Sequence, residues 1–109
     1  MKQRVLENEN VLNGKQDSIY NYLKKHHRGR KNAIRSPELE AIFNIKGSEL
    51  RKIINGIRSS GNPVCSDNTG YFYAADKDEL YSTNEQLSGR VSNILNARDG
   101  LHSALNLFI

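Results

Sequence analysis

An apolar stripe that ends at a glycine and a proline constrains this chain more than any other feature. Four apolar residues lie on one helical face with the spacing i, i+3, i+4, i+7: Leu50, Ile53, Ile54 and Ile57. That period predicts an amphipathic helix whose apolar face is buried. Gly61 permits the left-handed exit that ends a helix, and Pro63 prevents the helix from resuming. We therefore expect a helix from about residue 48 to residue 60, with its polar face in solvent.

A first, earlier helix is predicted from the same spacing. Its apolar face holds four residues: Ile19, Tyr22, Leu23 and His26. Asp17 or Ser18 is expected to cap its start, and Gly29 to end it. On this interpretation His26 is a half-buried core histidine, because no third ligand accompanies it to make a metal site.

A second, shorter helix is expected after a connector that holds a short strand at 33–35. Ser36 is a good N-cap, Pro37 has the φ that the first helical position needs, and Glu38 lies near the positive end of the helix dipole. The helix ends before a turn at 44–47. Its predicted core residues are Leu39, Ile42 and Phe43.

A β-hairpin is predicted directly after Gly61. Residues 63–66 and 71–74 are rich in β-branched and aromatic residues, and residues 67–70 (DNTG) have the composition of a tight turn. Tyr71 and Tyr73 alternate onto one face and are expected in the core, whereas Phe72 is expected on the hairpin surface. Cys65, the single cysteine, is expected to be buried and forms no disulfide within the chain.

The last third of the chain carries an apolar seam with heptad spacing. Asp76 and Glu79 resemble a capping box at its start. The seam positions alternate in steps of four and three: Leu80, Asn84, Leu87, Val91, Ile94, Arg98, Leu101, Leu105 and Phe108. Gly100 is a point where the helix is expected to split in two. The seam either folds back on its own chain or pairs with a second copy, in which case Leu80, Leu87, Val91, Ile94, Leu101 and Leu105 form the dimer interface.

Positive charge is concentrated in one half of the chain. Residues 15–58 hold eleven Lys and Arg against four Asp and Glu, and residues 76–109 hold three against five. A basic half joined to a mildly acidic half predicts a surface that binds a polyanion. An ordinary solvated basic surface is the alternative.

The order of these elements resembles a known family. The run FNIKGSELRKIINGIRSSGNPVCSDNTGYFYA, residues 43–74, is similar to the winged helix-turn-helix domain of the biotin operon repressor and its relatives. Phe43 to Ile45 match the turn, Gly61 matches the end of the recognition helix, and Gly70-Tyr71 match the second strand of the wing. The resemblance implies a mainly α fold with a small β-hairpin (α+β) and, here, a long C-terminal helical extension. More loosely, the small size and helical tail resemble accessory proteins of bacteriophages and prophages.

The resemblance implies double-stranded DNA as the partner, with the helix at 48–60 in the major groove. The side chains expected in the groove are Ser48, Arg51, Lys52 and Asn55, with Lys46 at the entrance to the helix. The cluster Arg28, Arg30 and Lys31, with Arg35, is expected to contact phosphates or a minor groove. A transcriptional regulator or a phage DNA-replication accessory protein, acting as a dimer, is the function expected. Glu49 and the acidic tail keep a second hypothesis open, a protein-interaction module that binds a host or partner protein.

Other classes of function have little support in the sequence. It holds no nucleophile–base set, paired carboxylates or phosphate-binding glycine loop, so we expect no enzyme and no cofactor. We expect no metal site, no membrane segment and a cytoplasmic location. The predicted organisation is a flexible arm over 1–16, the winged helix-turn-helix domain over 17–75, and a C-terminal helix or helix pair over 76–109.

Overall fold

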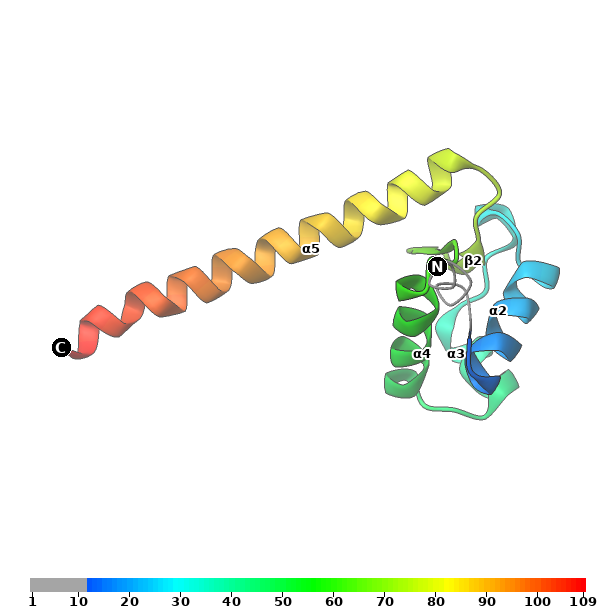
Figure 1. Cartoon of the computed structure of the whole chain (residues 1–109), viewed down its shortest axis with the longest axis horizontal. Helices are drawn as coiled ribbons and strands as arrows, with labels where there is room; N and C mark the ends of the chain where they lie inside the picture. Colours follow the sequence, from blue (N-terminus) through cyan, green and yellow to red (C-terminus); the bar gives the residue numbers. More distant parts are fainter. Residues whose placement is uncertain (1–11) are drawn as a thin grey trace, which may run out of the picture.

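The structure is a computed structural model that describes residues 12–109. A helical domain with a hairpin is followed by one long helix that projects away from it (Figure 1). The elements in chain order are α2 (Gly14–His26), η1 (Arg30–Asn32), α3 (Ser36–Phe43), α4 (Gly47–Ser59), β1 (Val64–Asp67), β2 (Gly70–Tyr73), α5 (Lys77–Ala104) and η2 (Leu105–Phe108). The prediction of a mainly helical protein with a small antiparallel hairpin is confirmed.

The first described helix, α2, begins earlier than predicted. Its N-cap is Asn13, whose side chain accepts a hydrogen bond from the backbone N–H of Gln16, while the Gln16 side chain accepts one from the backbone of Asn13. This capping box satisfies two N–H groups of the first turn, so the helix starts at Gly14 rather than at Asp17 or Ser18. The expected arm over 1–16 is wrong for its last residues, and residues 1–11 lie outside the described part of the chain.

The start of α3 differs from the prediction by one residue. Arg35 is the N-cap in an extended conformation, and no side chain caps the helix. The hydroxyl of Ser36 donates to Glu40 Oε2 at 2.7 Å, one turn further on. Leu39 is fully buried and Phe43 is half-buried, but Ile42 is 49% exposed, so the prediction that Ile42 belongs to the core is wrong.

The helix α4 forms as its apolar stripe predicts. All four stripe residues are buried, and Gly61 has a φ of 88°, which ends the helix in the left-handed region. The stripe packs with residues from three other elements into the main core, whose other buried members are Ile19, Leu23, Ile34, Leu39 and Val64.

The two strands pair antiparallel from Val64↔Tyr73 to Asp67↔Gly70, with two residues in the turn. Ile34 adds a single bridge to Tyr71, where a short strand was predicted at 33–35. Both faces of the hairpin are covered. Tyr71 packs against the main core, while Phe72 is 1% exposed and lies in a second cluster with Cys65 and Ala74. The expectation that Phe72 lies on the surface is therefore wrong.

Of the two adjacent histidines, the half-buried one is His27 rather than His26. His26 is exposed at the end of α2. The Nδ1 atom of His27 lies 2.7 Å from the carbonyl oxygen of Asn32, which ties the end of α2 to η1. The helix ends at His26, the last position of the apolar period, and His27, the C-cap, has the half-buried position that was predicted for His26.

Substitution of Gly70 is expected to damage this hairpin. Gly70 has a φ of 129°, and a Cβ there would lie 2.2 Å from the carbonyl oxygen of Ile34. Gly70→Ala should therefore lower the free energy of unfolding by about 1–3 kcal/mol, measured by urea denaturation. Gly89→Ala on α5 is the control, because nothing lies within 4 Å of its Cβ, and it should raise helix stability by about 1 kcal/mol or less. Equal effects of the two substitutions would contradict the strain at Gly70.

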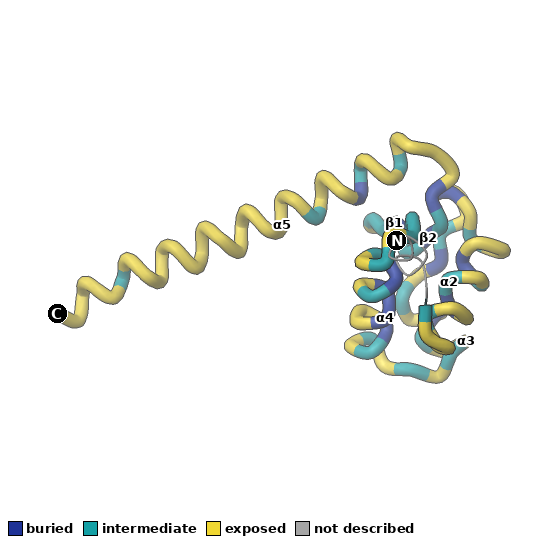
Figure 2. Tube along the Cα trace, in the orientation of Figure 1, coloured by how far each residue is buried: buried dark blue, intermediate teal, exposed yellow. Residues whose placement is uncertain are grey.

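The helix α5 is a single uninterrupted helix that passes through Gly100. The expected split at Gly100 is wrong, since the backbone stays helical to Ala104 and then tightens into η2. Figure 2 shows that most of α5 is exposed; Thr83 is its one buried residue. The alternative in which the seam folds back on its own chain is therefore wrong. Among residues 12–109, no helix is long and apolar enough to cross a membrane.

Candidate nucleic-acid interface

The polar face of α4 is open to solvent. The residues predicted to face the groove are all exposed, namely Lys46, Ser48, Arg51, Lys52 and Asn55. The first turn of α4 lies at the far end of the domain from the start of α5 (Figure 1). No side chain caps this first turn. The face combines three basic side chains with two short polar ones on a regular helix, beside backbone N–H groups that favour a bound anion.

The acidic residue in the first turn of α4 is paired within the fold. Lys15 Nζ on α2 lies 2.6 Å from Glu49 Oε2, in an ion pair whose two side chains are 65% and 42% exposed. Pairing offsets the charge of Glu49, which otherwise opposes the approach of a phosphate. Sequence reasoning missed this contact because it placed Lys15 in an arm outside the folded domain.

The last turn of α4 is fixed to the hairpin by Arg58. Its Nε donates to the carbonyl oxygen of Val64 at 2.8 Å, and Nη2 donates to Ser66 Oγ at 2.9 Å. Burial lowers the pKa of Arg58 below its ordinary value. Arg58 thus differs from Arg51 and Lys52 on the same helix, because its guanidinium holds β1 in place and is not free on the surface.

The second basic group predicted from sequence lies apart from the first. The N–H of Gly29 donates to Tyr73 at 2.7 Å, and that of Arg30 to Glu79 Oε2 at 3.0 Å, so the 28–31 segment is held against β2 and the start of α5. Figure 1 shows this cyan segment at the opposite end of the domain from the first turn of α4. The structure therefore does not bring the two basic groups together. Arg28 and Lys31 are exposed.

Several cations and tyrosines cluster beside that segment. The Arg28 guanidinium lies 5.4 Å from the ring centroid of Tyr73, and Lys24 Nζ lies 5.8 Å from it, within the range of a cation–π contact. Burial, with the neighbouring Tyr73, raises the pKa of Tyr20 to about 12. The sequence predicted a cluster of positive charge here, but it did not show that Lys24 and Arg28 lie over the same Tyr73 ring.

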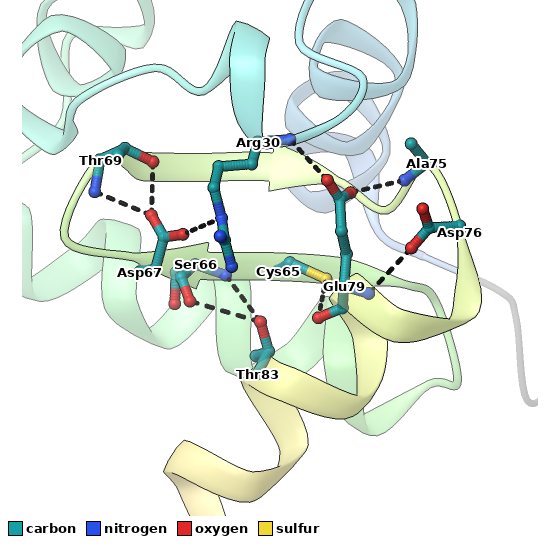
Figure 3. Close-up of polar contacts among 9 residues, drawn as sticks. All are labelled: Arg30, Cys65, Ser66, Asp67, Thr69, Ala75, Asp76, Glu79 and Thr83. Atoms are coloured by element: carbon teal, nitrogen blue, oxygen red, sulfur yellow. Dashed lines mark hydrogen bonds and ion pairs between the residues drawn. The ribbon is translucent and has the colours of Figure 1, made fainter.

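Arg30 is engaged with the hairpin turn, as Figure 3 shows. Its Nε lies 2.6 Å from Asp67 Oδ2, and the Asp67 side chain is only 9% exposed. The backbone N–H of Thr69 donates to Asp67 Oδ1 at 2.8 Å, and the Thr69 hydroxyl also contacts this oxygen. Arg35 lines a pocket of about 260 Å³ beside the turn, together with Asn68 and Tyr71. The turn is thus held in place by Arg30, and Arg35 lies next to it.

The environment of Asp67 predicts a loss of stability in acid. Burial by itself raises the pKa of this carboxyl, but the hydrogen bonds from Thr69 and the Arg30 guanidinium outweigh it, so the pKa lies below its ordinary value. A lowered folded-state pKa adds stability above the unfolded value of about 3.9, and that stability is lost as the pH falls through the folded pKa. Asp67→Asn should therefore be less stable than the parent at pH 7 and lose less stability in acid, as urea midpoints would show. Glu85→Gln, at an exposed carboxylate, is the control; a parent-like Asp67→Asn would contradict the assignment.

The start of α5 is fastened to the hairpin by a polar network (Figure 3). Asp76 caps the helix by accepting from the N–H of Glu79 at 2.9 Å. The Glu79 carboxylate accepts hydrogen bonds from the backbone N–H groups of Arg30 and Ala75 rather than from that of Asp76. Only one half of the expected capping box therefore forms. The Thr83 hydroxyl accepts from the Ser66 N–H at 3.2 Å. These contacts fix the direction in which α5 leaves the domain.

A groove of about 500 Å³ lies between the start of α5 and the segment that follows α4. Its lining comes from Pro63 and Val64 on one side and from Leu80, Tyr81 and Leu87 on the other. Most of the exposed lining is apolar. No local sequence pattern predicts this groove, because it depends on the angle at which α5 leaves the hairpin.

Within the described residues, no group of three or more His, Cys, Asp or Glu side chains is placed to hold a metal ion. Comparison with protein-family models, characterised proteins and solved structures finds no significant match to this chain.

Proposed function

We propose that this chain is a double-stranded DNA-binding protein of the winged helix-turn-helix class. One observation carries the proposal: the polar face of α4 is basic, regular and uncovered, while its apolar face is fully committed to the core. The major groove of B-DNA admits one α-helix, and side chains from the front of that helix reach base edges. The order α3, turn, α4 and hairpin supports the resemblance to the biotin operon repressor domain.

In this proposal each exposed side chain predicted to contact DNA from α4 and its N-cap has a role. Arg51 or Lys52 pairs with guanine N7 and O6, and Asn55 with adenine N6 and N7, each contributing about 1–3 kcal/mol of discrimination. Ser48 also points into the groove, and Lys46, at the entrance to the helix, contacts the phosphate backbone beside it. Pairing of Glu49 with Lys15 lowers the electrostatic cost of this approach.

The second basic group makes further phosphate contacts in this proposal. Arg28, Lys31 and Arg35 are exposed and contact the DNA backbone outside the groove that α4 enters. Arg30 contributes less, because its guanidinium, 51% exposed, is already paired with Asp67.

The exposed seam of α5 supports a homodimer. Its apolar positions lie uncovered, with Val91 56%, Ile94 67% and Leu101 74% exposed. Two α4 helices would then contact one duplex, as in dimeric regulators and phage replication accessory proteins. The same exposed helix and the apolar groove favour one alternative function, a module that binds a partner protein through α5.

Salt dependence of binding separates these two functions. The logarithm of affinity for a mixed-sequence duplex should fall linearly with the logarithm of salt concentration, with a slope of about −2.7 to −4.5 per domain if about three to five phosphates are contacted. Fluorescence anisotropy between 50 and 200 mM salt measures this slope. No binding, or binding with a flat response, would contradict DNA recognition and favour the protein-interaction module.

A further inference from the structure

The exposed apolar side chains of the described chain are concentrated on α5 and the residues after it. Ten of the eleven large exposed hydrophobic residues lie between Leu80 and Ile109. Six of these ten occupy seam positions, with exposed fractions between 42% at Leu80 and 87% at Phe108. A helix with this much exposed apolar surface along one seam has a face that a partner is expected to cover.

The seam begins inside the groove of the domain. Leu80, Asn84 and Leu87 are the first three seam positions, and all three line the groove together with Pro63 and Val64. A helix that packs along the seam therefore enters the groove at this end. The occupant must be slender and apolar, since most of the exposed lining is apolar.

The two polar seam positions indicate the direction of the partner. In a parallel pair in register, Asn84 faces Asn84, but Arg98 faces Arg98 and two like charges meet in the seam. In an antiparallel pair, Leu80 lies opposite the partner's Leu105 and Asn84 lies opposite the partner's Leu101. The same register sets Leu87 against the partner's Arg98 and Val91 against the partner's Ile94.

This antiparallel register brings unlike polar groups together. Arg98 lies one layer from the partner's Asn84, whose side-chain oxygen is an acceptor for the guanidinium. Within a single copy, Asn84 and Arg98 are about 21 Å apart along the helix, and among residues 12–109 the ion-pair partner of Arg98 is the adjacent exposed Asp99, at 3.2 Å. Every seam position from Leu80 to Leu105 also acquires a partner in this register.

We propose that α5 pairs antiparallel with α5 of a second copy and that residues 98–108 of each copy lie along the groove of the other. The inference rests on the homodimer of the proposed function and adds its direction, register and groove contact. The two Leu80 residues then lie about 37 Å apart, at 1.5 Å per residue, and the two domains occupy opposite ends of a rod. The apolar end of α5, which the single chain leaves exposed, is covered in this arrangement.

Disulfide trapping tests this arrangement directly. Cys65 is the only cysteine and is fully buried, so an introduced thiol on α5 is the accessible one. Asn84→Cys and Leu101→Cys, one of them with a mass tag, are prepared separately, mixed, exchanged by unfolding and refolding, and oxidised mildly with glutathione. Leu80→Cys and Leu105→Cys form a second pair that reports on the groove. Sedimentation of the reduced mixtures gives the mass of the assembly.

The antiparallel arrangement predicts cross-linked mixed dimers in both pairs and no cross-linking of any variant alone, because a disulfide needs Cα atoms within about 7 Å. Cross-linking of Asn84→Cys with itself would overturn the direction while leaving the homodimer intact. A dimeric mass without cross-links in either pair would overturn the register. A monomeric mass at high concentration would overturn both the inference and the proposed homodimer.

Discussion

Arg51→Ala combined with Lys52→Ala is expected to weaken binding to a mixed-sequence duplex at least tenfold. Both side chains are exposed on the open face of α4, so the fold loses nothing when they are truncated. Each contributes a phosphate or base contact in the proposed complex, and the salt slope should become shallower by about two if both contact phosphates. Anisotropy titrations at several salt concentrations measure the affinity and the slope together.

A matched control distinguishes the effect of where the two positive charges lie from the effect of net charge on DNA affinity. Lys24→Ala combined with Lys25→Ala removes the same two charges from the last turn of α2, which lies on the other side of the domain from α4 (Figure 1). This control should lose less than threefold in affinity. Equal losses in the two double variants would mean that net charge alone drives binding, and an unchanged Arg51/Lys52 variant would exclude α4 as the docking helix.

Ile94→Asp is expected to dissociate the proposed homodimer. Ile94 lies at the middle of the seam and is 67% exposed in the single chain, so its replacement leaves the domain fold intact. In the dimer it introduces two buried carboxylates, and the dissociation constant should rise at least a hundredfold, which corresponds to about 2.7 kcal/mol. DNA affinity should fall as well, because two linked domains bind one duplex more tightly than one. Sedimentation over a concentration series measures the first effect.

Asn96→Asp is the control for this substitution. Asn96 is exposed and lies on the face of α5 opposite the seam in the heptad pattern, so the same charge there should leave the dimer unchanged. If both variants behave like the parent, or if the parent is a monomer throughout the series, the seam has no role in self-association.

The apolar spacing of the sequence predicted α4 and α5 well, because the residues that specify a helix lie close together in the sequence. The stripe at Leu50, Ile53 and Ile57 specified the buried face of α4, and Gly61 specified its end. The seam of α5 predicted a helix with one apolar side. The heptad spacing did not reveal whether the apolar side of α5 is covered. Its exposure depends on the direction in which α5 leaves the domain, and the polar contacts of Glu79 and Thr83 determine that direction.

Contacts between distant residues account for most of what the sequence did not show. The alternation of Tyr71 and Phe72 correctly placed them on opposite faces of the hairpin, but the second face is also covered: Phe72 is buried there together with Cys65 and Ala74, and Ala33 packs against this cluster. The pairing of Arg30 with Asp67 joins residues 37 positions apart and has no local signature. Charge counts therefore described the basic half correctly but did not distinguish free side chains from those engaged within the fold.

Helix starts depend on backbone conformation as well as on residue type. Ser36 has the right chemistry for an N-cap, yet Arg35 is in the extended conformation, and Ser36 donates to Glu40 instead. Asn13 was available as a cap with Gln16 three residues later, and that capping box extends α2 into the stretch expected to be an arm. In both cases a residue earlier in the chain than the predicted one is the N-cap of the helix.

The most direct test of the central claim, that the polar face of α4 enters a DNA groove, is a titration of ¹⁵N-labelled protein with a short duplex, followed by amide chemical shifts. The largest shifts are expected at residues 46–55, centred on Ser48, Arg51 and Lys52, with smaller shifts at 28–35. Shifts confined to α5 and the groove beside Pro63, or a spectrum unchanged by DNA, would contradict the claim.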